Sequence, residues 1–379
     1  MLRDGLAAGE HARAANYVEA VAMNENGVRL RNTVTGEEFS FEADVVVNTS
    51  GPWTDLTNKA LGSESTFMGG TKGSHIVLDN PELLAATGGR EIFFEHSDGR
   101  IVLIYPLKGR VMVGTTDLEH DMTKPILCTE EEIDYFFELV AHVFPDVAVD
   151  RSDIVYRFSG VRPLPRHDDE APGFVSRDYR IESSPLEARP GTLLSLVGGK
   201  WTTFRALAEH LSNDILKLIN VPRTVSTEGL AIGGGKGFPT TDAAHRVWVA
   251  AHGDEVGAPR ATQLLARYGT RAADVIAFTT EEADAPLVHN ADYSRREIEY
   301  LATTESVVHL IDILLRRTSM AFVGGLSAEL LTELTDIVAP ILGWSAERRQ
   351  SEIEAATTEL RDVHAVDLAR TDKGSLTAV

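Results

Sequence analysis

The sequence predicts a mixed α/β fold followed by an all-helical C-terminal part. Much of residues 15–121 alternates between apolar and polar positions broken by turn residues, a pattern typical of half-buried strands. Two apolar runs, ADVVVNTSG at 43–51 and LLSLVGGK at 193–200, stop on small residues, as buried parallel strands do. Beyond residue 244, apolar residues recur at helical spacing, which predicts packed helices.

Composition limits the partners and the compartment. The 379 residues carry a formal net charge of −21, which argues against nucleic acid and a basic membrane-binding patch, because both need excess Lys and Arg. Cys128 is the only cysteine, so we expect no disulfide and no metal site, and we interpret it as a space-filling residue. No run approaches the roughly 20 apolar residues that span a bilayer, and residues 1–16 lack the apolar core of a signal peptide. We therefore expect a protein that is soluble or peripheral to a membrane.

The strand-rich half divides at its turn residues. Turns at Asn24–Gly27 and Thr35–Gly36 split residues 15–41 into the strands of a meander. Residues 70–121, with a turn at Lys108–Gly109, predict a second, antiparallel sheet.

Two further segments can be assigned from local signals. Thr129 is expected to cap a helix over TEEEIDYFFELVAHVFPD, with Glu132 three residues later completing a capping box. Gly233–Gly235 is followed by Lys236 but lacks the Gly-Lys-Ser/Thr ending of a phosphate loop, so we interpret it as a linker.

A proline-broken loop between two predicted strands carries Arg162, Arg166 and Arg177. The guanidinium fork suits a phosphate or a carboxylate, which is the functional interpretation. In so acidic a chain, simple pairing with neighbouring carboxylates is the alternative, and the residues leave both open. The carboxylates nearby are Asp168, Asp169, Glu170 and Asp178.

The stretch LLSLVGGKWTTFR at 193–205 runs from a buried strand through two glycines into the first turn of a helix. Such a turn bares backbone N–H groups and about half a positive charge, which suits an anion or an electron-rich ring. Gly198 and Gly199 would let that ligand come close. An ordinary strand-to-helix turn is the alternative here, as it is for Thr49–Pro52 after the earlier strand.

Six motifs occur in one order along the chain: NTSGPWTD, KGSHIVL, GRVMVGTTDLEHD, FSGVRPL, SRDYRI and GGKWTTFR. Together they resemble the flavin-dependent glycerol-3-phosphate dehydrogenases, and LLRRTSMAF resembles the C-terminal domain of that family. The resemblance runs from about Ala15 to Leu360, and six ordered motifs are far more specific than one.

The resemblance implies a fold and a domain order. The expected fold combines a Rossmann-like FAD-binding domain of the glutathione-reductase type, an antiparallel substrate-domain sheet and a C-terminal helical domain. The implied segments are 1–60 for the first part of the FAD-binding domain, 61–160 for the substrate-binding sheet, 161–232 for the return to the FAD-binding domain and 233–379 for the helical domain.

The family also begins with a strand, a G-x-G-x-x-G turn and a helix that hold the FAD pyrophosphate, and this sequence contains no such fingerprint. The chain therefore resembles a family member that lacks the N-terminal FAD-binding segment, so the FAD-binding domain is expected to be incomplete. Residues 1–379 alone are expected to hold FAD poorly, because the amides that anchor the pyrophosphate are missing.

The resemblance also implies roles for individual residues. Arg162 and Arg177 correspond to a phosphate clamp, Lys200 lies near the reacting oxygen, and His75 is the candidate general base. A packed strand histidine is the alternative for His75. The implied FAD contacts are Val18, Thr49, Ser50, Gly51, Gly198, Gly199, Lys200, Trp201 and Thr202.

The implied activity is FAD-dependent oxidation of sn-glycerol 3-phosphate to dihydroxyacetone phosphate, with a quinone as acceptor, in glycerol and glycerophospholipid metabolism. Two alternatives stay open: a glycerol-3-phosphate oxidase that uses oxygen, and an inactive truncated remnant that acts only as an interaction module. We expect a cytoplasmic protein, with peripheral contact to the inner face of the cell membrane and a homodimer as open alternatives.

Overall fold

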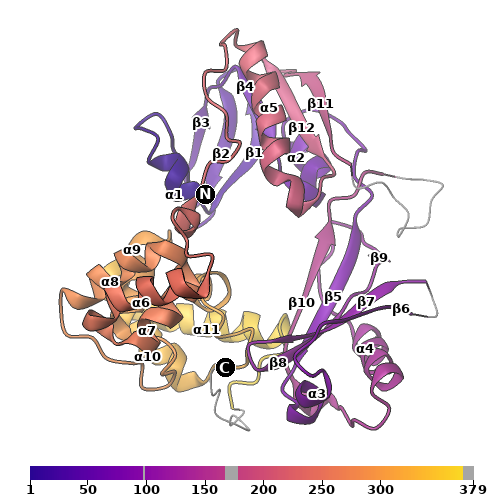
Figure 1. Cartoon of the computed structure of the whole chain (residues 1–379). Helices are drawn as coiled ribbons and strands as arrows, with labels where there is room; N and C mark the ends of the chain where they lie inside the picture. The colour runs from indigo at the N-terminus through magenta and orange to yellow at the C-terminus, as the bar shows by residue number, and fades with distance from the viewer. Residues whose placement is uncertain (97–98, 167–177, 370–379) are drawn as a thin grey trace.

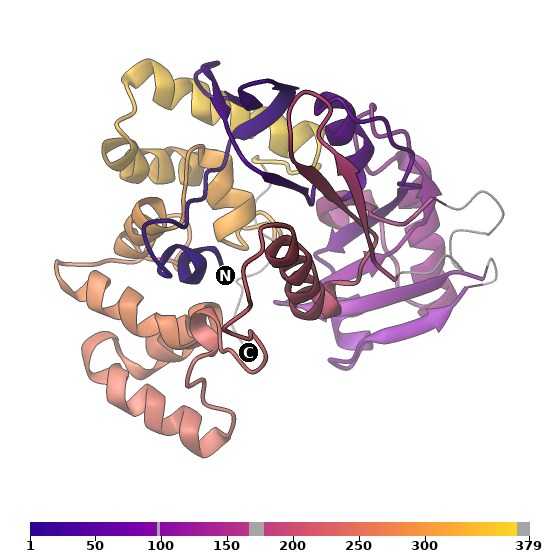
Figure 2. The same cartoon turned by 90° about the horizontal axis from the view of Figure 1, so that it is seen from above.

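The computed structural model describes residues 1–96, 99–166 and 178–369, which form three lobes (Figure 1). A mixed lobe at the top of the view combines residues 18–60 with residues 180–218, so two distant parts of the chain share it. A sheet lobe lies at the right, and a helical lobe formed by the C-terminal part lies at the lower left. The view from above keeps the helical and sheet lobes on opposite sides (Figure 2).

The mixed lobe contains two three-stranded sheets. The predicted meander is confirmed: β1 (Val18–Asn24), β2 (Gly27–Asn32) and β3 (Glu38–Phe41) pair antiparallel in that order. In the second sheet, β12 (Thr192–Val197) pairs parallel with β4 (Val45–Asn48) and antiparallel with β11 (Arg180–Pro185). The two apolar runs are therefore adjacent parallel strands, as their composition predicts. Each leads into a 3-10 turn and a helix: Gly51–Trp53 into α2 (Thr54–Ala60), and Trp201–Thr203 into α5 (Phe204–Leu218).

The sheet lobe is the predicted antiparallel sheet, with strand order β10-β5-β8-β7-β6 and β9 beside β5. Its strands are β5 (Thr71–Leu78), β6 (Ile92–Glu95), β7 (Ile101–Leu107), β8 (Arg110–Gly114), β9 (Leu118–Glu119) and β10 (Ile154–Arg162). Its helices are α3 (Pro81–Ala86) and α4 (Glu130–Val143). The capping box of α4 is confirmed, since the Thr129 side chain accepts from the Glu132 N–H and the Glu132 side chain accepts from the Thr129 N–H.

The two faces of β5 serve different cores. Ile76 and Leu78 lie in the core that also contains Phe136 of α4 and Cys128, and all four are buried. Val77 points to the opposite face, into the core of the helical lobe. Because alternate residues of a strand face opposite sides, Thr71, Gly73 and His75 share the face of Val77.

The helical lobe is built from α6 (Asp242–Val256), α7 (Ala258–Tyr268), α8 (Ala272–Thr280), α9 (Arg295–Thr304), α10 (Ala328–Leu342) and α11 (Ala346–Asp362). Serine side chains cap three of these helices, for example Ser294 at α9 and Ser327 at α10. The apolar stretch after α9 does not continue as an α-helix but forms a π-helical turn at Asp312–Arg317. Gly234, in the segment interpreted as a linker, packs directly on the backbone of Tyr268 and Gly269.

The N-terminal residues contact the helical lobe. In α1 (Leu2–Leu6), Arg3 donates to the Tyr300 hydroxyl and to Glu305. Tyr17 donates to Asp312 at 2.6 Å. The segment that precedes β1 is therefore joined to the helical lobe by polar contacts.

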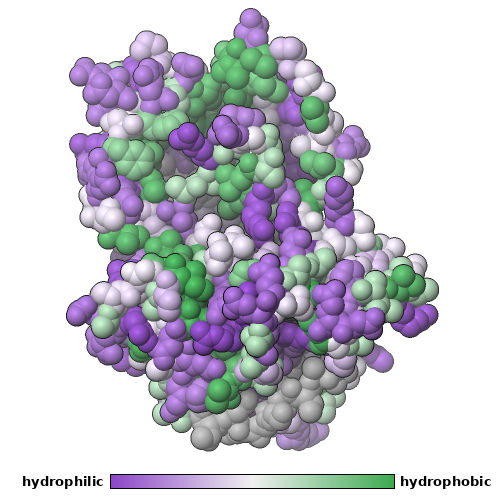
Figure 3. All heavy atoms as spheres, turned by 90° about the vertical axis from the view of Figure 1, so that its left-hand side faces the viewer, coloured by the Kyte–Doolittle hydropathy of each residue, from purple (hydrophilic) through white to green (hydrophobic). Residues whose placement is uncertain are grey.

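The surface formed by the mixed and helical lobes is mostly hydrophilic, with scattered hydrophobic residues (Figure 3). Among the helices of the described residues, none is long and apolar enough to span a membrane. The domain boundaries implied at residues 60, 160 and 232 stay predictions.

Candidate functional site

Two turns lie at the same edge of the β11-β12-β4 sheet. Because β4 and β12 are parallel, with Asn48 opposite Ser195, the turns that follow them both leave the carboxyl edge. The segment after β10 touches both. A methyl group on Gly51 would lie 3.9 Å from the Pro163 Cβ, and one on Gly198 would lie 3.2 Å from the Pro165 Cγ. The end of β10, where Arg162 lies, is therefore brought beside both turns.

The first turn is held by the buried side chain of Asn48. Its Oδ1 accepts from the Ser50 N–H at 3.1 Å and the Ser50 hydroxyl at 2.7 Å, and its Nδ2 donates to the Thr54 carbonyl at 3.0 Å. Gly51 has a φ of 63°, a left-handed conformation that glycine adopts without strain. Thr49 is exposed at the rim of this turn.

The second turn needs both of its glycines for packing. Gly198 has a φ of 79°, and a Cβ there would lie 2.6 Å from the Asp178 carbonyl oxygen. Gly199 has a φ of 108° and faces Leu207 of α5. After them, Lys200, Trp201 and Thr202 are exposed, and 84% of the Trp201 surface is open. The turn therefore presents a lysine, a large aromatic ring and the first amides of a helix on one surface.

His75 lies in the middle of β5, on the face directed at the helical lobe. Its ring stacks on Phe158 of β10 with centroids 4.8 Å apart. A Cβ on Gly114, its neighbour on β8, would lie 2.2 Å from the His75 Cδ2, so glycine makes room for the ring. Burial, together with the charge of Arg162, lowers the pKa of His75 to about 4. Its buried Nδ1 has no hydrogen-bond partner among the described residues.

Arg162 lies on the same face, over Gly73, where a Cβ would lie 2.5 Å from its Nη2. The turn after β8 holds the guanidinium. Nη1 donates to the Thr116 carbonyl at 3.2 Å and pairs with Asp117 at 3.0 Å, and Nη2 donates to the Thr115 hydroxyl at 3.1 Å. The side chain keeps 25% of its surface exposed. It is thus oriented and yet accessible to a small anion.

The structure brings some of the predicted site residues near one another. His75 and Arg162 share one face of the sheet, and the two turns meet the end of β10. Val18 lies at the start of β1 in the meander, where it pairs with Asn32. Arg177 lies outside the described residues.

Sequence reasoning missed the residues that hold the site in place. Thr115, Thr116 and Asp117 belong to the motif GRVMVGTTDLEHD, which carried part of the resemblance, but nothing in that motif indicated that these residues would contact Arg162. Asn48 and Phe158 were also missed. The neighbouring carboxylates at 168–170 lie outside the described residues, and one ion pair of Arg162 is with Asp117.

The residues present fit a flavin beside an anionic substrate. An electron-rich ring system suits the second turn, which offers backbone amides at a helix start, Lys200 and the exposed Trp201. The Nδ1 of His75, which has no partner among the described residues, suits a hydrogen bond to a ligand. The described residues hold no group of three or more His, Cys, Asp or Glu side chains placed to bind a metal ion.

Comparisons with known proteins agree with this geometry. A family model described as FAD dependent oxidoreductase matches residues 3–205. The chain belongs to this FAD-dependent oxidoreductase family. A second model, described as the C-terminal domain of alpha-glycerophosphate oxidase, matches residues 225–349. The mixed α/β fold with an antiparallel sheet and a helical C-terminal region is thus confirmed, and FAD is the cofactor of the family.

Individual relatives carry consistent names. The mitochondrial glycerol-3-phosphate dehydrogenase of Rattus norvegicus is 30% identical over 371 residues, which cover 91% of this chain and 49% of the rat protein. That of Arabidopsis thaliana is 30% identical over 368 residues, covering 91% of this chain and 57% of the plant protein. The chain spans about half the length of the curated relatives it matches.

A solved structure shares the fold. The glycerol-3-phosphate dehydrogenase of Bacillus halodurans, complexed with FAD, superimposes with a TM-score of 0.74 at 22% identity. The match covers 94% of this chain and 71% of the bacterial chain.

Proposed function

We propose that this protein oxidises sn-glycerol 3-phosphate to dihydroxyacetone phosphate with FAD and passes the electrons to a quinone, in glycerol and glycerophospholipid metabolism. The observation that carries the proposal is that His75 and Arg162 share one sheet face, and that the segment directly after Arg162 lies beside two amide-bearing turns. This oxidation needs a group that accepts a proton, a guanidinium that binds the phosphate, and a turn whose backbone amides can face a flavin. The names of the relatives support the same substrate.

Arg162 binds the substrate phosphate in this proposal. Its guanidinium is held by Asp117 and the Thr115 hydroxyl, which leaves the exposed edge in a set orientation for a dianion. Arg177 is proposed as the second arm of the clamp. Lys200 is proposed to lie near the reacting oxygen, where its charge stabilises developing negative charge.

His75 accepts the proton of the C2 hydroxyl, and we assign this role to Nδ1. Because the pKa of His75 is lowered to about 4, the ring is neutral near pH 7 and keeps one unprotonated nitrogen as an acceptor, while the same burial makes it a weaker base than a free imidazole. FAD, when bound, supplies the acceptor for the hydride that leaves C2. The residues proposed to hold FAD are Val18, Thr49, Ser50, Gly51, Gly198, Gly199, Lys200, Trp201 and Thr202.

One observation favours a second candidate, a glycerol-3-phosphate oxidase that uses oxygen. Residues 225–349 match a domain described from alpha-glycerophosphate oxidase. The relatives are named dehydrogenases rather than oxidases, which favours an acceptor other than oxygen, and we propose a quinone as that acceptor. Since quinones dissolve in lipid, the quinone proposal also includes a cytoplasmic protein in peripheral contact with the inner face of the cell membrane. A homodimer is proposed separately, and the lipid solubility of the quinone does not bear on it.

Two measurements test the proposal. Titration calorimetry should show binding of glycerol 3-phosphate but not of glycerol, and Arg162→Ala should abolish the difference. In a version of the protein that also carries the N-terminal FAD-binding segment of a relative, anaerobic glycerol 3-phosphate should bleach the flavin absorption, with a quinone analogue or oxygen then restoring it. If glycerol 3-phosphate binds but no flavin is loaded or bleached, the inactive interaction module is favoured. If glycerol 3-phosphate neither binds nor bleaches the flavin, the proposal is refuted.

A further inference from the structure

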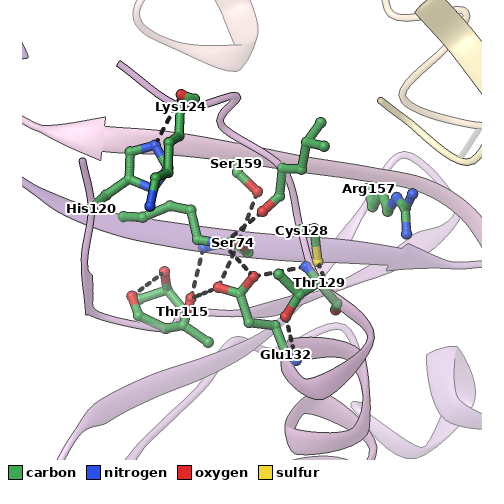
Figure 4. A network of polar contacts seen from close by, with 12 residues as sticks. Ser74, Thr115, His120, Lys124, Cys128, Thr129, Glu132, Arg157 and Ser159 are labelled. Atoms are coloured by element: carbon green, nitrogen blue, oxygen red, sulfur yellow. Dashed lines mark hydrogen bonds and ion pairs between the residues drawn. The ribbon is translucent and has the colours of Figure 1, made fainter. Parts of the chain in front are cut away.

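A buried polar network lies behind the candidate site, on the opposite face of β5 (Figure 4). The carboxylate of Glu132 lies at its centre, and the Glu132 side chain keeps only 3% of its surface exposed. It accepts hydrogen bonds from Lys72 Nζ at 2.7 Å, Ser74 Oγ at 2.8 Å, Thr116 Oγ1 at 2.6 Å and the Thr129 N–H at 2.9 Å. In Figure 4 the carboxylate points from the helix toward Ser74 on the strand.

Stability alone does not account for this arrangement. The network borders an apolar core that includes Ile76 and Phe136, and a buried ion pair in such a place often stabilises no more than well-packed apolar residues would. Burial would raise the pKa of Glu132, but the hydrogen bonds from Lys72 and Thr116 and those from the Thr129 N–H and Ser74 outweigh it and hold the pKa below its usual range. The carboxylate therefore stays charged and accepts from all four donors.

Thr116 connects this network to the candidate site. Its hydroxyl donates to Glu132 and accepts from the Ser74 N–H at 2.9 Å, while its carbonyl accepts from Arg162 Nη1 at 3.2 Å. The residues on either side, Thr115 and Asp117, also contact the Arg162 guanidinium. The turn that orients Arg162 is therefore anchored at its middle residue by Glu132.

We propose that Glu132 is a positioning residue for Arg162 and acts through Thr116. Glu132 contacts neither substrate nor cofactor. It holds the Thr115–Asp117 turn so that the guanidinium is oriented before an anion arrives, which lowers the ordering cost of binding. The identity of that anion, the phosphate of glycerol 3-phosphate, rests on the proposed function.

The first test measures coupling between Glu132 and Arg162. Glu132→Gln keeps the shape but removes the charge, and it should weaken glycerol 3-phosphate binding by roughly 3- to 30-fold. Thr116→Val, a milder change, should do the same. In an Arg162→Ala background, Glu132→Gln should change the affinity by less than about twofold, because the group that it positions is gone.

Ser159→Ala is the matched control. Ser159 contacts the Ser74 hydroxyl at 2.7 Å, in the same network but on the branch away from Thr116. Its removal should lower thermal stability but leave the affinity unchanged. The proposal is overturned if Glu132→Gln lowers the affinity equally in the wild-type and Arg162→Ala backgrounds. It is also overturned if Ser159→Ala lowers the affinity as much as Glu132→Gln does. Either result would assign Glu132 a merely structural role.

A second test needs no substrate, so it separates this inference from the proposed function. Nuclear magnetic resonance relaxation of the Arg162 Nε–Hε group should show a rigid side chain in the wild type and a more mobile one in Glu132→Gln and Thr116→Val. Ser159→Ala should match the wild type. If the wild-type protein does not bind glycerol 3-phosphate, the proposed function fails, while this mobility difference still supports the positioning role and its absence still refutes it.

Discussion

Burial of His75 should make the protein lose stability in acid, and His75→Asn should remove that loss. The pKa of His75 falls from 6.5 to about 4 on folding because burial and Arg162 disfavour the charged ring. Between these two pH values the unfolded chain binds more protons than the folded one. The free energy of unfolding therefore rises with pH across this window and falls as the solution is acidified.

The size of the effect follows from the shift. A change from 6.5 to about 4, at about 1.4 kcal/mol per pKa unit, corresponds to about 3 kcal/mol lost in full below pH 4. The sequence pI is near 5.0, so measurements should stay above it. By pH 5.5 the His75 contribution should already be lower by about 1.4 kcal/mol than at pH 8.

Urea unfolding followed by circular dichroism, between pH 8 and 5.5, provides the assay. The wild type should lose more stability than His75→Asn over this range, so that the difference between them shrinks in acid. Exposed His11→Asn is the control and should follow the wild type. Parallel stability profiles for the wild type and His75→Asn, or a His75 ring that titrates near 6.5 by nuclear magnetic resonance, would refute the reasoning.

Three further predictions concern the clamp, the base and the core. In steady-state assays, Arg162→Ala should raise the KM for glycerol 3-phosphate by about one to two decades, because the loss of a charged hydrogen bond to a dianion weakens affinity by about this factor. A change below about threefold would contradict the phosphate clamp. In a version of the protein that carries the N-terminal FAD-binding segment of a relative, His75→Asn should slow flavin reduction by about 100-fold in stopped-flow measurements, whereas an unchanged rate would move the base role elsewhere. Phe136 lies on the buried face of α4, so Phe136→Ala should lower the free energy of unfolding by about 3–5 kcal/mol in urea titrations. A loss under about 1 kcal/mol would contradict its core position.

Much of the fold could be predicted because its signals are local. Alternation predicts the meander, small residues after apolar runs predict the paired β4 and β12, and Thr129 with Glu132 predicts the start of α4. The partners of Arg162 could not be predicted in this way. Asp117 is 45 residues away, and only the pairing of β5 with β8, β9 and β10 brings the two together.

Two glycines in the strands of the sheet lobe indicate where other groups approach the backbone closely, which the alternation of apolar and polar residues does not show. Glycine weakens a strand unless another group approaches its backbone closely. Gly73 leaves space for the Arg162 guanidinium and Gly114 leaves space for the His75 ring, since a Cβ at either position would overlap those side chains. The same two glycines place an arginine and a histidine flat against one face of a sheet whose other face carries the Glu132 network. Two neighbouring strands of this sheet, β5 and β8, therefore each carry a glycine where the sheet face holds the groups proposed to bind the phosphate and accept the proton.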